Sequence, residues 1–172
     1  MIINSIEALL FGAGRPIRLS EIKNILENTG IKEELPEIKK ALNELEKRYE
    51  GTSIEIKEVA SGYRLQIKED HSSCLNHLWN EKTPRVSKAL METISIIAFK
   101  QPVTRGDIEG IRGVSVNPQI IRNMIEFEWI KVVGHKDTPG RPELLATTKK
   151  FLDYFNLKSL SDLPPPSEIS TQ

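Results

Sequence analysis

The sequence predicts an α+β fold, mainly helical, with two tandem winged-helix domains joined by a short linking helix. In each half, three segments with apolar residues at helical spacing precede a segment in which apolar residues alternate. Three helices followed by a β-hairpin make up the winged-helix arrangement. The halves also align at an offset of 86 residues, with Pro16-Ile17 over Pro102-Val103 and Glu21-Ile22 over Asp107-Ile108. So few matches could arise by chance, but the shared order of elements favours a duplicated module.

The first domain begins with three predicted helices. The first is expected to end at Gly12, which suits a left-handed helix stop. The second is expected to start at a Ser20 cap and to run to Gly30. The third alternates steps of three and four residues. The apolar stripes are Ile3, Ile6, Leu9 and Leu10 in the first helix, Ile22, Ile25 and Leu26 in the second, and Leu35, Ile38, Leu42, Leu45 and Tyr49 in the third.

A β-hairpin and a linking helix complete this domain. After Gly51 the apolar period changes to two on both sides of a Ser61-Gly62 turn, with one face formed by Ile54, Ile56, Tyr63, Leu65 and Ile67. A linking helix over residues 69–80 has its apolar side at Leu75, Leu78 and Trp79, and Glu81-Lys82-Thr83-Pro84 forms the joint. We therefore place the N-terminal domain, with the linking helix, at residues 1–80.

The second domain repeats the pattern with clearer helix starts. Thr104 and Asp107 have the spacing of a capping box. Asn117-Pro118 places a capping side chain before a proline at the first helical position. The first helix presents Val86, Leu90, Ile94 and Ile97 on one face, and the third carries Ile121, Met124, Ile125 and Trp129.

Two short strands and one more helix follow. The strands are expected at residues 130–133 and 144–146, around a turn at Asp137-Thr138-Pro139-Gly140. A helix over Thr148–Phe155 turns Phe151, Leu152 and Phe155 inward. The C-terminal domain is placed at residues 81–163. The proline run and polar residues of 164–172 predict a disordered tail.

Charge and apolar patterning restrict the function classes. The chain has 24 Lys and Arg residues against 24 Asp and Glu residues, and the halves before and after residue 80 carry net charges of −2 and +2. Neither half has the basic excess of a strong DNA-binding protein, although a basic wing with Lys136 and Arg141 leaves weak binding open. No apolar stretch approaches the roughly 20 residues of a membrane span, no secretory signal is visible, and Cys74 is the single cysteine. We expect a soluble protein of a reducing compartment.

No pattern predicts catalysis, a metal site or a cofactor. The triplet His71-x-x-Cys74-x-x-His77 lacks the fourth ligand of a structural zinc site, so an ordinary polar helix face is favoured. Gly12-Ala13-Gly14 follows a helix rather than a strand and lacks the rest of a phosphate-binding motif. We expect no catalytic residues.

Two blocks carry a resemblance to a known family. They are Ile97-Ala98-Phe99-Lys100-Gln101-Pro102-Val103-Thr104 and Gly140-Arg141-Pro142-Glu143-Leu144. With these blocks, the chain from residue 1 to about residue 164 resembles the segregation and condensation protein B family of bacteria and archaea. The family usually has a tyrosine in a segment after the second block, whereas this chain has Leu145-Ala146-Thr147-Thr148.

The resemblance implies a non-catalytic subunit of the SMC–kleisin complex that condenses and segregates prokaryotic chromosomes. Such a subunit homodimerises through its first domain and binds the central region of the kleisin, which connects it indirectly to the SMC ATPase. Direct DNA binding would be weak or absent, no membrane would be involved, and the protein would be cytoplasmic and associated with the nucleoid through the complex. The alternative function, from a different class of protein, is that of a winged-helix DNA-binding transcription regulator.

Two sets of residues are candidates for the partner surfaces. We expect Lys100, Gln101, Arg141 and Tyr154 on or beside the kleisin groove, with Phe99 as an apolar anchor. For dimerisation we favour the exposed side of the N-terminal helix, around Ile2, Ile3 and Ile6. A competing interpretation buries these three isoleucines in their own core, and periodicity does not separate the two.

Overall fold

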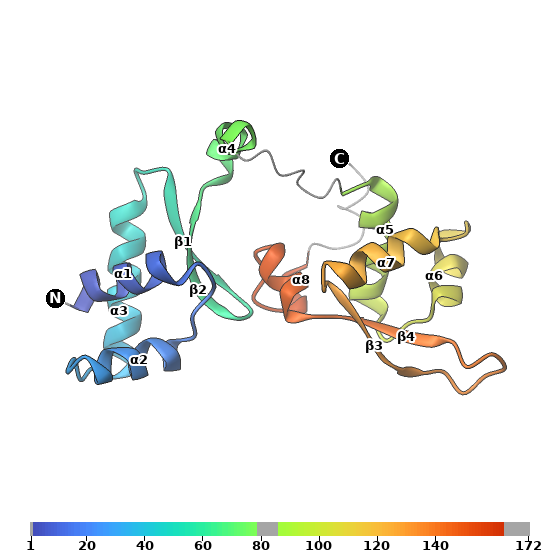
Figure 1. Ribbon diagram of the computed structural model, residues 1–172, viewed down its shortest axis with the longest axis horizontal. Coiled ribbons are helices and arrows are strands. Elements are labelled where there is room, and N and C mark those ends of the chain that lie inside the picture. Colours follow the sequence, from blue (N-terminus) through green and yellow to red (C-terminus); the bar gives the residue numbers. More distant parts are fainter. Residues whose placement is uncertain (1, 79–85, 164–172) are drawn as a thin grey trace. The chain divides into compact units, whose positions relative to one another are not determined.

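The computed structural model describes residues 2–78 and 86–163, with side chains omitted at 76–78. The chain divides into two compact units, Met1–Glu81 and Lys82–Gln172 (Figure 1). The predicted joint Glu81-Lys82-Thr83-Pro84, the side chains of Leu78 and Trp79, and the predicted tail of 164–172 lie outside the described residues. Both units combine helices with a small antiparallel hairpin, so the predicted α+β, mainly helical winged-helix fold is confirmed.

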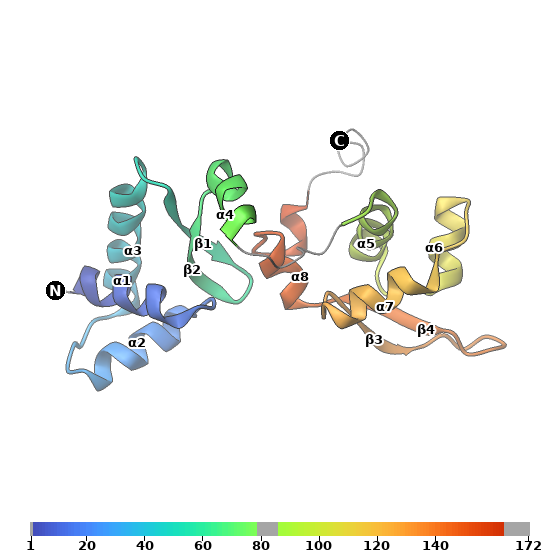
Figure 2. The same ribbon diagram turned by 45° about the horizontal axis from the view of Figure 1, so that its top comes forward.

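The first unit packs three helices on one side of a hairpin (Figure 2). In chain order its elements are α1 (Ile2–Ala13), α2 (Leu19–Asn28), α3 (Leu35–Tyr49), β1 (Ile54–Val59), β2 (Gly62–Ile67), the 3-10 helix η1 (Glu69–His71) and α4 (Ser72–Leu78). The core residues come from the three long helices, the segment between α1 and α2, and the hairpin: Ile6, Leu10, Ile17, Ile22, Leu26, Ile38, Ala41, Leu42, Leu45 and Ile56.

Two helix ends in this unit differ from the prediction. α1 continues through Gly12, and the left-handed residue is Gly14, with φ of 61°. α2 begins at Leu19 after Arg18, which has no side-chain capping bond, so Ser20 lies inside the helix and is not its cap. At the C-terminal end of α2, the N–H groups of Gly30 and Ile31 donate to the carbonyls of Glu27 and Leu26. Gly30 has a left-handed backbone, so this end is a Schellman motif.

One short backbone pairing joins the hairpin to the helices. Ile17, between α1 and α2, exchanges two hydrogen bonds of 2.8 Å with Tyr63 of β2. Gly62 comes directly before this contact, with φ of 131°, and a Cβ placed there would lie 2.2 Å from the Ile17 carbonyl oxygen. The pairing therefore requires glycine at position 62.

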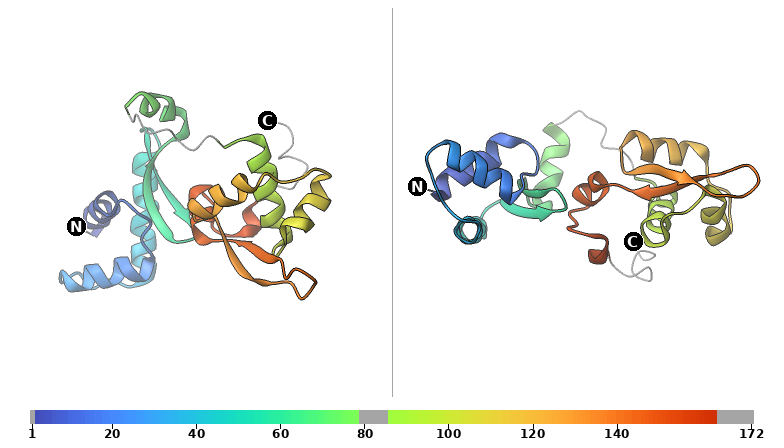
Figure 3. Two further views of the ribbon diagram at one scale, coloured as in Figure 1. Left: turned by 45° about the vertical axis from the view of Figure 1, so that its right-hand side comes forward. Right: turned by 90° about the horizontal axis from the view of Figure 1, so that it is seen from below.

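The second unit repeats the order of three helices and a hairpin, and it too continues into short helical segments. Its elements are α5 (Lys88–Lys100), α6 (Arg105–Arg112), α7 (Pro118–Glu126), β3 (Ile130–His135), β4 (Glu143–Thr147), α8 (Lys149–Tyr154) and the 3-10 helix η2 (Leu160–Asp162). The turn of the β3–β4 hairpin projects beyond the helices (Figure 3). Val103 pairs with Leu145 of β4 as Ile17 does with Tyr63, and positions 17 and 103 are the pair that the 86-residue offset aligns.

Side-chain caps begin three helices of this unit, and those at Thr104 and Asn117 were predicted. Ser87 accepts from the N–H of Leu90, and Asn117 accepts from the N–H of Gln119. Thr104 and Asp107 form the complete capping box of α6. These side chains satisfy N–H groups that the first turn of a helix leaves without an intrahelical partner.

The end of α7 differs from the prediction. The helix stops at Glu126, and the N–H groups of Glu128 and Trp129 donate to Ile125 and Met124. This is the Schellman pattern, with Glu128 at φ of 56° in the position usually held by glycine. Trp129 therefore lies beyond the helix, buried before β3, rather than on the helix as predicted.

A glycine replacement tests the pairing between hairpin and helices. Gly62→Ala is expected to lower the free energy of unfolding by at least about 2 kcal/mol, because the new methyl group meets backbone and the φ is unfavourable for alanine. Urea unfolding measures the change. Gly51→Ala is the control, since nothing lies within 4 Å of a Cβ there. Equal stabilities for the two variants would contradict the assignment.

Candidate partner-binding surfaces

The C-terminal end of α5 is tied to β4 by one amide side chain. Gln101 Oε1 accepts hydrogen bonds from the backbone N–H of Thr147 at 2.7 Å and from its hydroxyl at 3.0 Å. Gln101 Nε2 donates to the carbonyl of Ala98 at 3.2 Å. Gln101 thus uses both ends of its amide inside the unit and positions its neighbours Phe99 and Lys100.

Those neighbours are open to solvent. Phe99 is 38% exposed although its helix belongs to the core, and Lys100 is exposed. Lys100 makes no ion pair within the described part of the chain. An aromatic ring beside an unpaired cation can contact both the apolar and the acidic side chains of a partner.

Tyr154 lies on the edge of an aromatic cluster that holds α8 in place. Its ring centroid is 4.7 Å from that of Trp129 and 5.1 Å from that of Phe155. Trp129 also contacts Phe127 and Phe155, and Phe151 packs on Phe155. Whereas Trp129 is buried, Tyr154 is 46% exposed, so its ring has one packed side and one open side.

Arg141 lies in the turn of the β3–β4 hairpin. Its backbone has φ of 39°, and its N–H donates to the carbonyl of Thr138 at 2.8 Å. The side chain is exposed and has no ion pair among residues 86–163. The turn fixes the backbone and leaves the guanidinium free.

The five predicted residues divide into two places. Gln101 meets Thr147 at the end of β4 from which α8 starts, so the end of α5 lies beside the start of α8. Arg141 precedes β4 and lies at its other end. A five-residue strand separates its two ends by roughly 17 Å. The structure therefore gathers Phe99, Lys100 and Gln101 near α8 and leaves Arg141 at the far end of the hairpin.

The second cation of the wing is held against α6. Lys136 Nζ lies 3.0 Å from Asp107 Oδ1, and Asp107 Oδ2 accepts from the N–H and hydroxyl of Thr104 at 2.9 and 2.8 Å. The hydrogen bonds from Thr104, followed by the Lys136 ammonium, lower the pKa of Asp107 to about 2. Lys136 is thus partnered inside the unit, and the open cation of the predicted basic wing is Arg141.

The predicted dimer residues of α1 have different environments. Ile6 is fully buried in the first core, while Ile2 and Ile3 are partly buried against it. The sequence analysis did not single out Phe11 of the same helix, which is 80% exposed. It was detectable, because a large aromatic residue outside the apolar stripe of a helix has no place in the core that the stripe covers. Exposed Asn4 and Ala8 precede Phe11 at helical spacing, on the same side of α1.

Within residues 2–78 and 86–163, no three His, Cys, Asp or Glu side chains are placed to hold a metal ion. Cys74 is exposed, and the side chain of His77 lies outside the described residues. No helix in the described ranges is long and apolar enough to span a membrane.

Comparison with known proteins decides the family. A family model described as the segregation and condensation complex subunit ScpB matches residues 4–166, which span both units.

The chain belongs to the segregation and condensation protein B family.

Relatives in this family match almost the whole chain. The segregation and condensation protein B homolog of Coxiella burnetii is 45% identical over 164 residues, covering 95% of this chain and 78% of that protein. Segregation and condensation protein B of Moorella thermoacetica is 38% identical, covering 96% and 83%. A solved ScpB N-terminal domain, a dimer complexed with an ScpA peptide, is 30% identical and covers 45% of this chain and 93% of that chain, with a TM-score of 0.40.

The acid response of this family member tests the Asp107 network. Because folding lowers the pKa of Asp107 from an ordinary 3.8 to about 2, its ionised form stabilises the fold above the ordinary value. That stabilisation is lost as the pH falls through the folded pKa. Asp107→Asn should therefore be less stable than the unmodified chain at neutral pH, and the difference should shrink between about pH 5 and about pH 2.

Urea unfolding at several pH values measures this difference. Asp137→Asn is the control, because Asp137 is exposed on the same hairpin without an ion pair among the described residues. A stability difference for Asp107→Asn that stays constant down to pH 2 would contradict the role of its carboxylate.

Proposed function

We propose that this chain is a non-catalytic subunit of the SMC–kleisin complex in chromosome condensation and segregation. In this proposal it dimerises through the first unit and binds the central region of the kleisin. The observation that carries the proposal is the match of residues 4–166 to a family model described as a complex subunit. The match includes both units and both blocks of the resemblance.

The proposal assigns no chemistry to this chain. ATP hydrolysis belongs to the SMC partner, which the chain reaches through the kleisin, and no catalytic residue, metal or cofactor is assigned here. The protein acts in the cytoplasm and associates with the nucleoid through the complex. Direct contact with DNA is weak or absent, since the third helices mix both charge signs and Lys136 is paired with Asp107.

Two places in the second unit support kleisin binding. The open side of Tyr154 and the exposed Phe99 and Lys100 offer apolar surface with a cation. Arg141 offers a second cation at the far end of β4. Since about five extended residues span this separation, one kleisin segment can reach both places. Gln101 supports this surface by positioning the end of α5 through Thr147.

For dimerisation, the exposed residues of α1 are the candidates. Phe11 has the largest exposed fraction among the exposed large apolar residues of the described chain. Ile2 and Ile3 contribute partial surface, whereas Ile6 is occupied in the core. An aromatic ring of this exposure is typical of an interface anchor.

Light scattering on a size-exclusion column tests the dimer. The unmodified chain is expected near twice 19.5 kDa, and Phe11→Ser is expected to shift it toward 19.5 kDa because the apolar anchor is lost. Phe99→Ser is the matched control, since that ring is exposed in the other unit. Dimers that persist in both Phe11→Ser and Ile2→Ser would exclude this surface of α1.

Charge reversal tests kleisin capture. The variant Lys100→Glu with Arg141→Glu is expected to weaken binding of the organism's own central kleisin region at least about tenfold, through loss of two cations and repulsion of acidic groups. Titration calorimetry measures the affinity, and urea unfolding verifies the fold. Lys88→Glu, at the opposite end of α5, is the control. Unchanged capture would remove both residues from the site.

If the unmodified chain ignores the kleisin and stays monomeric, the proposed function fails. A DNA titration at several salt concentrations then tests the transcription-regulator alternative, whose binding would weaken steeply with salt.

A further inference from the structure

One edge of the hairpin in the second unit has free backbone groups. Leu145 of β4 exchanges its N–H and C=O with Val103, at 2.8 and 3.1 Å. Leu145 also lies opposite Val132 of β3. Since its hydrogen-bonding groups face Val103, the pair with Val132 is not hydrogen-bonded. In such a pair the opposite residue turns its own N–H and C=O outward.

The same edge continues at the other end of β3. The Lys136 N–H donates to the Pro142 carbonyl at 2.9 Å, so positions 136 and 142 form a hydrogen-bonded pair. His135 therefore turns its N–H and C=O outward. Between Val132 and Gly134 the register shifts by one residue, which places the extra residue Val133 in a β-bulge. The outward groups of Val132 and His135 have no hydrogen-bond partner in the described part of the chain.

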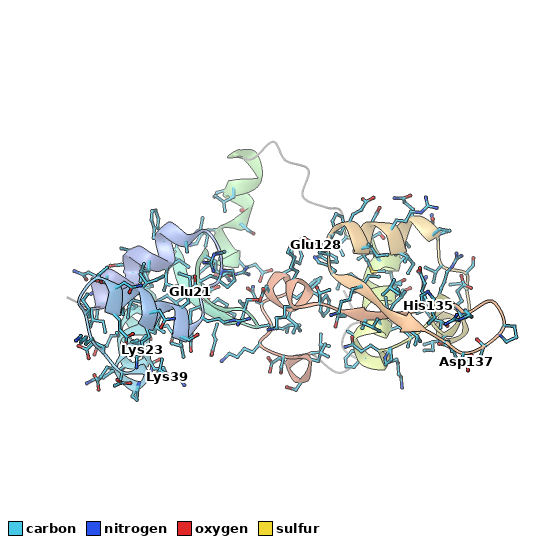
Figure 4. The ribbon with its side chains drawn as sticks, turned by 60° about the horizontal axis from the view of Figure 1, so that its bottom comes forward. Glu21, Lys23, Lys39, Glu128, His135 and Asp137 are labelled. Atoms are coloured by element: carbon cyan, nitrogen blue, oxygen red, sulfur yellow. The ribbon has the colours of Figure 1, made fainter. Side chains whose placement is uncertain are left out.

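Side chains along this edge are also exposed. Val132 is 41% exposed and Val133 48%, although both are β-branched residues that favour a covered strand. Figure 4 shows Glu128 before β3 and His135 with Asp137 at its far end. Between them β3 is the outer strand of the hairpin, because Val103 pairs with β4, and the bulge at Val133 interrupts it. A border with exposed apolar residues and free backbone groups is a template for another strand.

The charged residues of β3 favour some kinds of added strand over others. Lys131 is the charged residue of the strand at neutral pH, and the strand contains no carboxylate. The equivalent strand of the first unit, β1, carries Glu55 and Glu58 with Lys57 between them, a net negative charge. Pairing β3 with the β3 of a second copy would bring two lysine-bearing strands together, which disfavours that occupant. An acidic segment would instead place carboxylates beside Lys131.

We infer that the free edge of β3 binds an extended, acidic segment of the kleisin by strand addition. This inference rests on the proposed function and adds the mode of recognition. The added strand takes hydrogen bonds from Val132 and His135, covers the two valines with apolar side chains, and faces Lys131 with a carboxylate. A segment without structure of its own can order in this way on binding.

Amide exchange tests strand addition directly. The full chain, labelled with ¹⁵N, is measured alone and with the organism's own central kleisin region. On binding, exchange of the Val132 and His135 amides is expected to slow at least about tenfold, because these N–H groups gain acceptors. The Lys131 amide is the internal control. The carbonyl of Trp129 accepts from the Thr148 N–H, so the backbone groups of Trp129 face β4. Lys131 lies two residues further along the strand, so its N–H faces β4 as well. Exchange of the Lys131 amide should therefore change less.

A backbone variant tests the same contact independently. Val132→Pro removes the outward N–H but no hydrogen bond of the hairpin, a position at which edge strands accept proline. It is expected to weaken kleisin binding at least about tenfold, whereas Val132→Thr, which keeps the N–H, should bind within about threefold of the unmodified chain. Urea unfolding of both variants verifies that the hairpin is retained.

The outcomes separate the two proposals. If the kleisin region binds and neither amide is protected, strand addition is overturned while the proposed function stands. If the kleisin region does not bind, the proposed function is wrong, and the inference that a kleisin segment occupies this edge is wrong with it. If both amides are already protected in the free dimer and become exposed on dilution to monomers, a second copy occupies the edge and the inference is wrong.

Discussion

One pair of backbone hydrogen bonds in each unit connects the helices to the hairpin, and the rest of the fold depends on it. Ile17 with Tyr63, and Val103 with Leu145, add a third short strand to a two-stranded ribbon. A lone hairpin is marginal in water, and this strand ties it to the helical core. The pairing also gives the wing two unlike edges. One edge pairs with Ile17 or Val103. In the second unit the other edge has backbone N–H and C=O groups of Val132 and His135 without a partner in the described residues.

The sequence was most informative where one side chain satisfies one local need. Thr104 with Asp107, and Asn117 with Pro118, mark helix starts because the capping bonds form within three residues. Other helix boundaries did not follow the local pattern. Gly12 and Ser20 are compatible with a stop and a cap, but α1 continues to Ala13 and α2 already starts at Leu19. Glu128 takes a left-handed conformation that no local pattern indicates, while its carboxylate pairs with Lys150 across the unit.

The same distinction separates the candidate site residues. Gln101 belongs to a sequence block that suggested a partner contact, yet Thr147, which its amide holds, is 46 positions away. Spacing cannot reveal such a contact, because it depends on how β4 returns to α5. Phe11 could have been found, since an aromatic residue outside the apolar stripe of α1 requires another explanation. Whether Ile2, Ile3 and Ile6 were buried depended on which side of the helix met α2 and α3, and the helical period leaves that open.

The two ties that hold the ends of the second hairpin differ in chemistry. Gln101 joins α5 to one end through neutral amide and hydroxyl groups, whereas Lys136 joins the other end to α6 through an exposed ion pair. Added salt weakens an exposed ion pair, whereas it has little effect on neutral hydrogen bonds. Higher ionic strength therefore weakens the contact near the turn of the hairpin and leaves the contact beside α8 nearly unchanged.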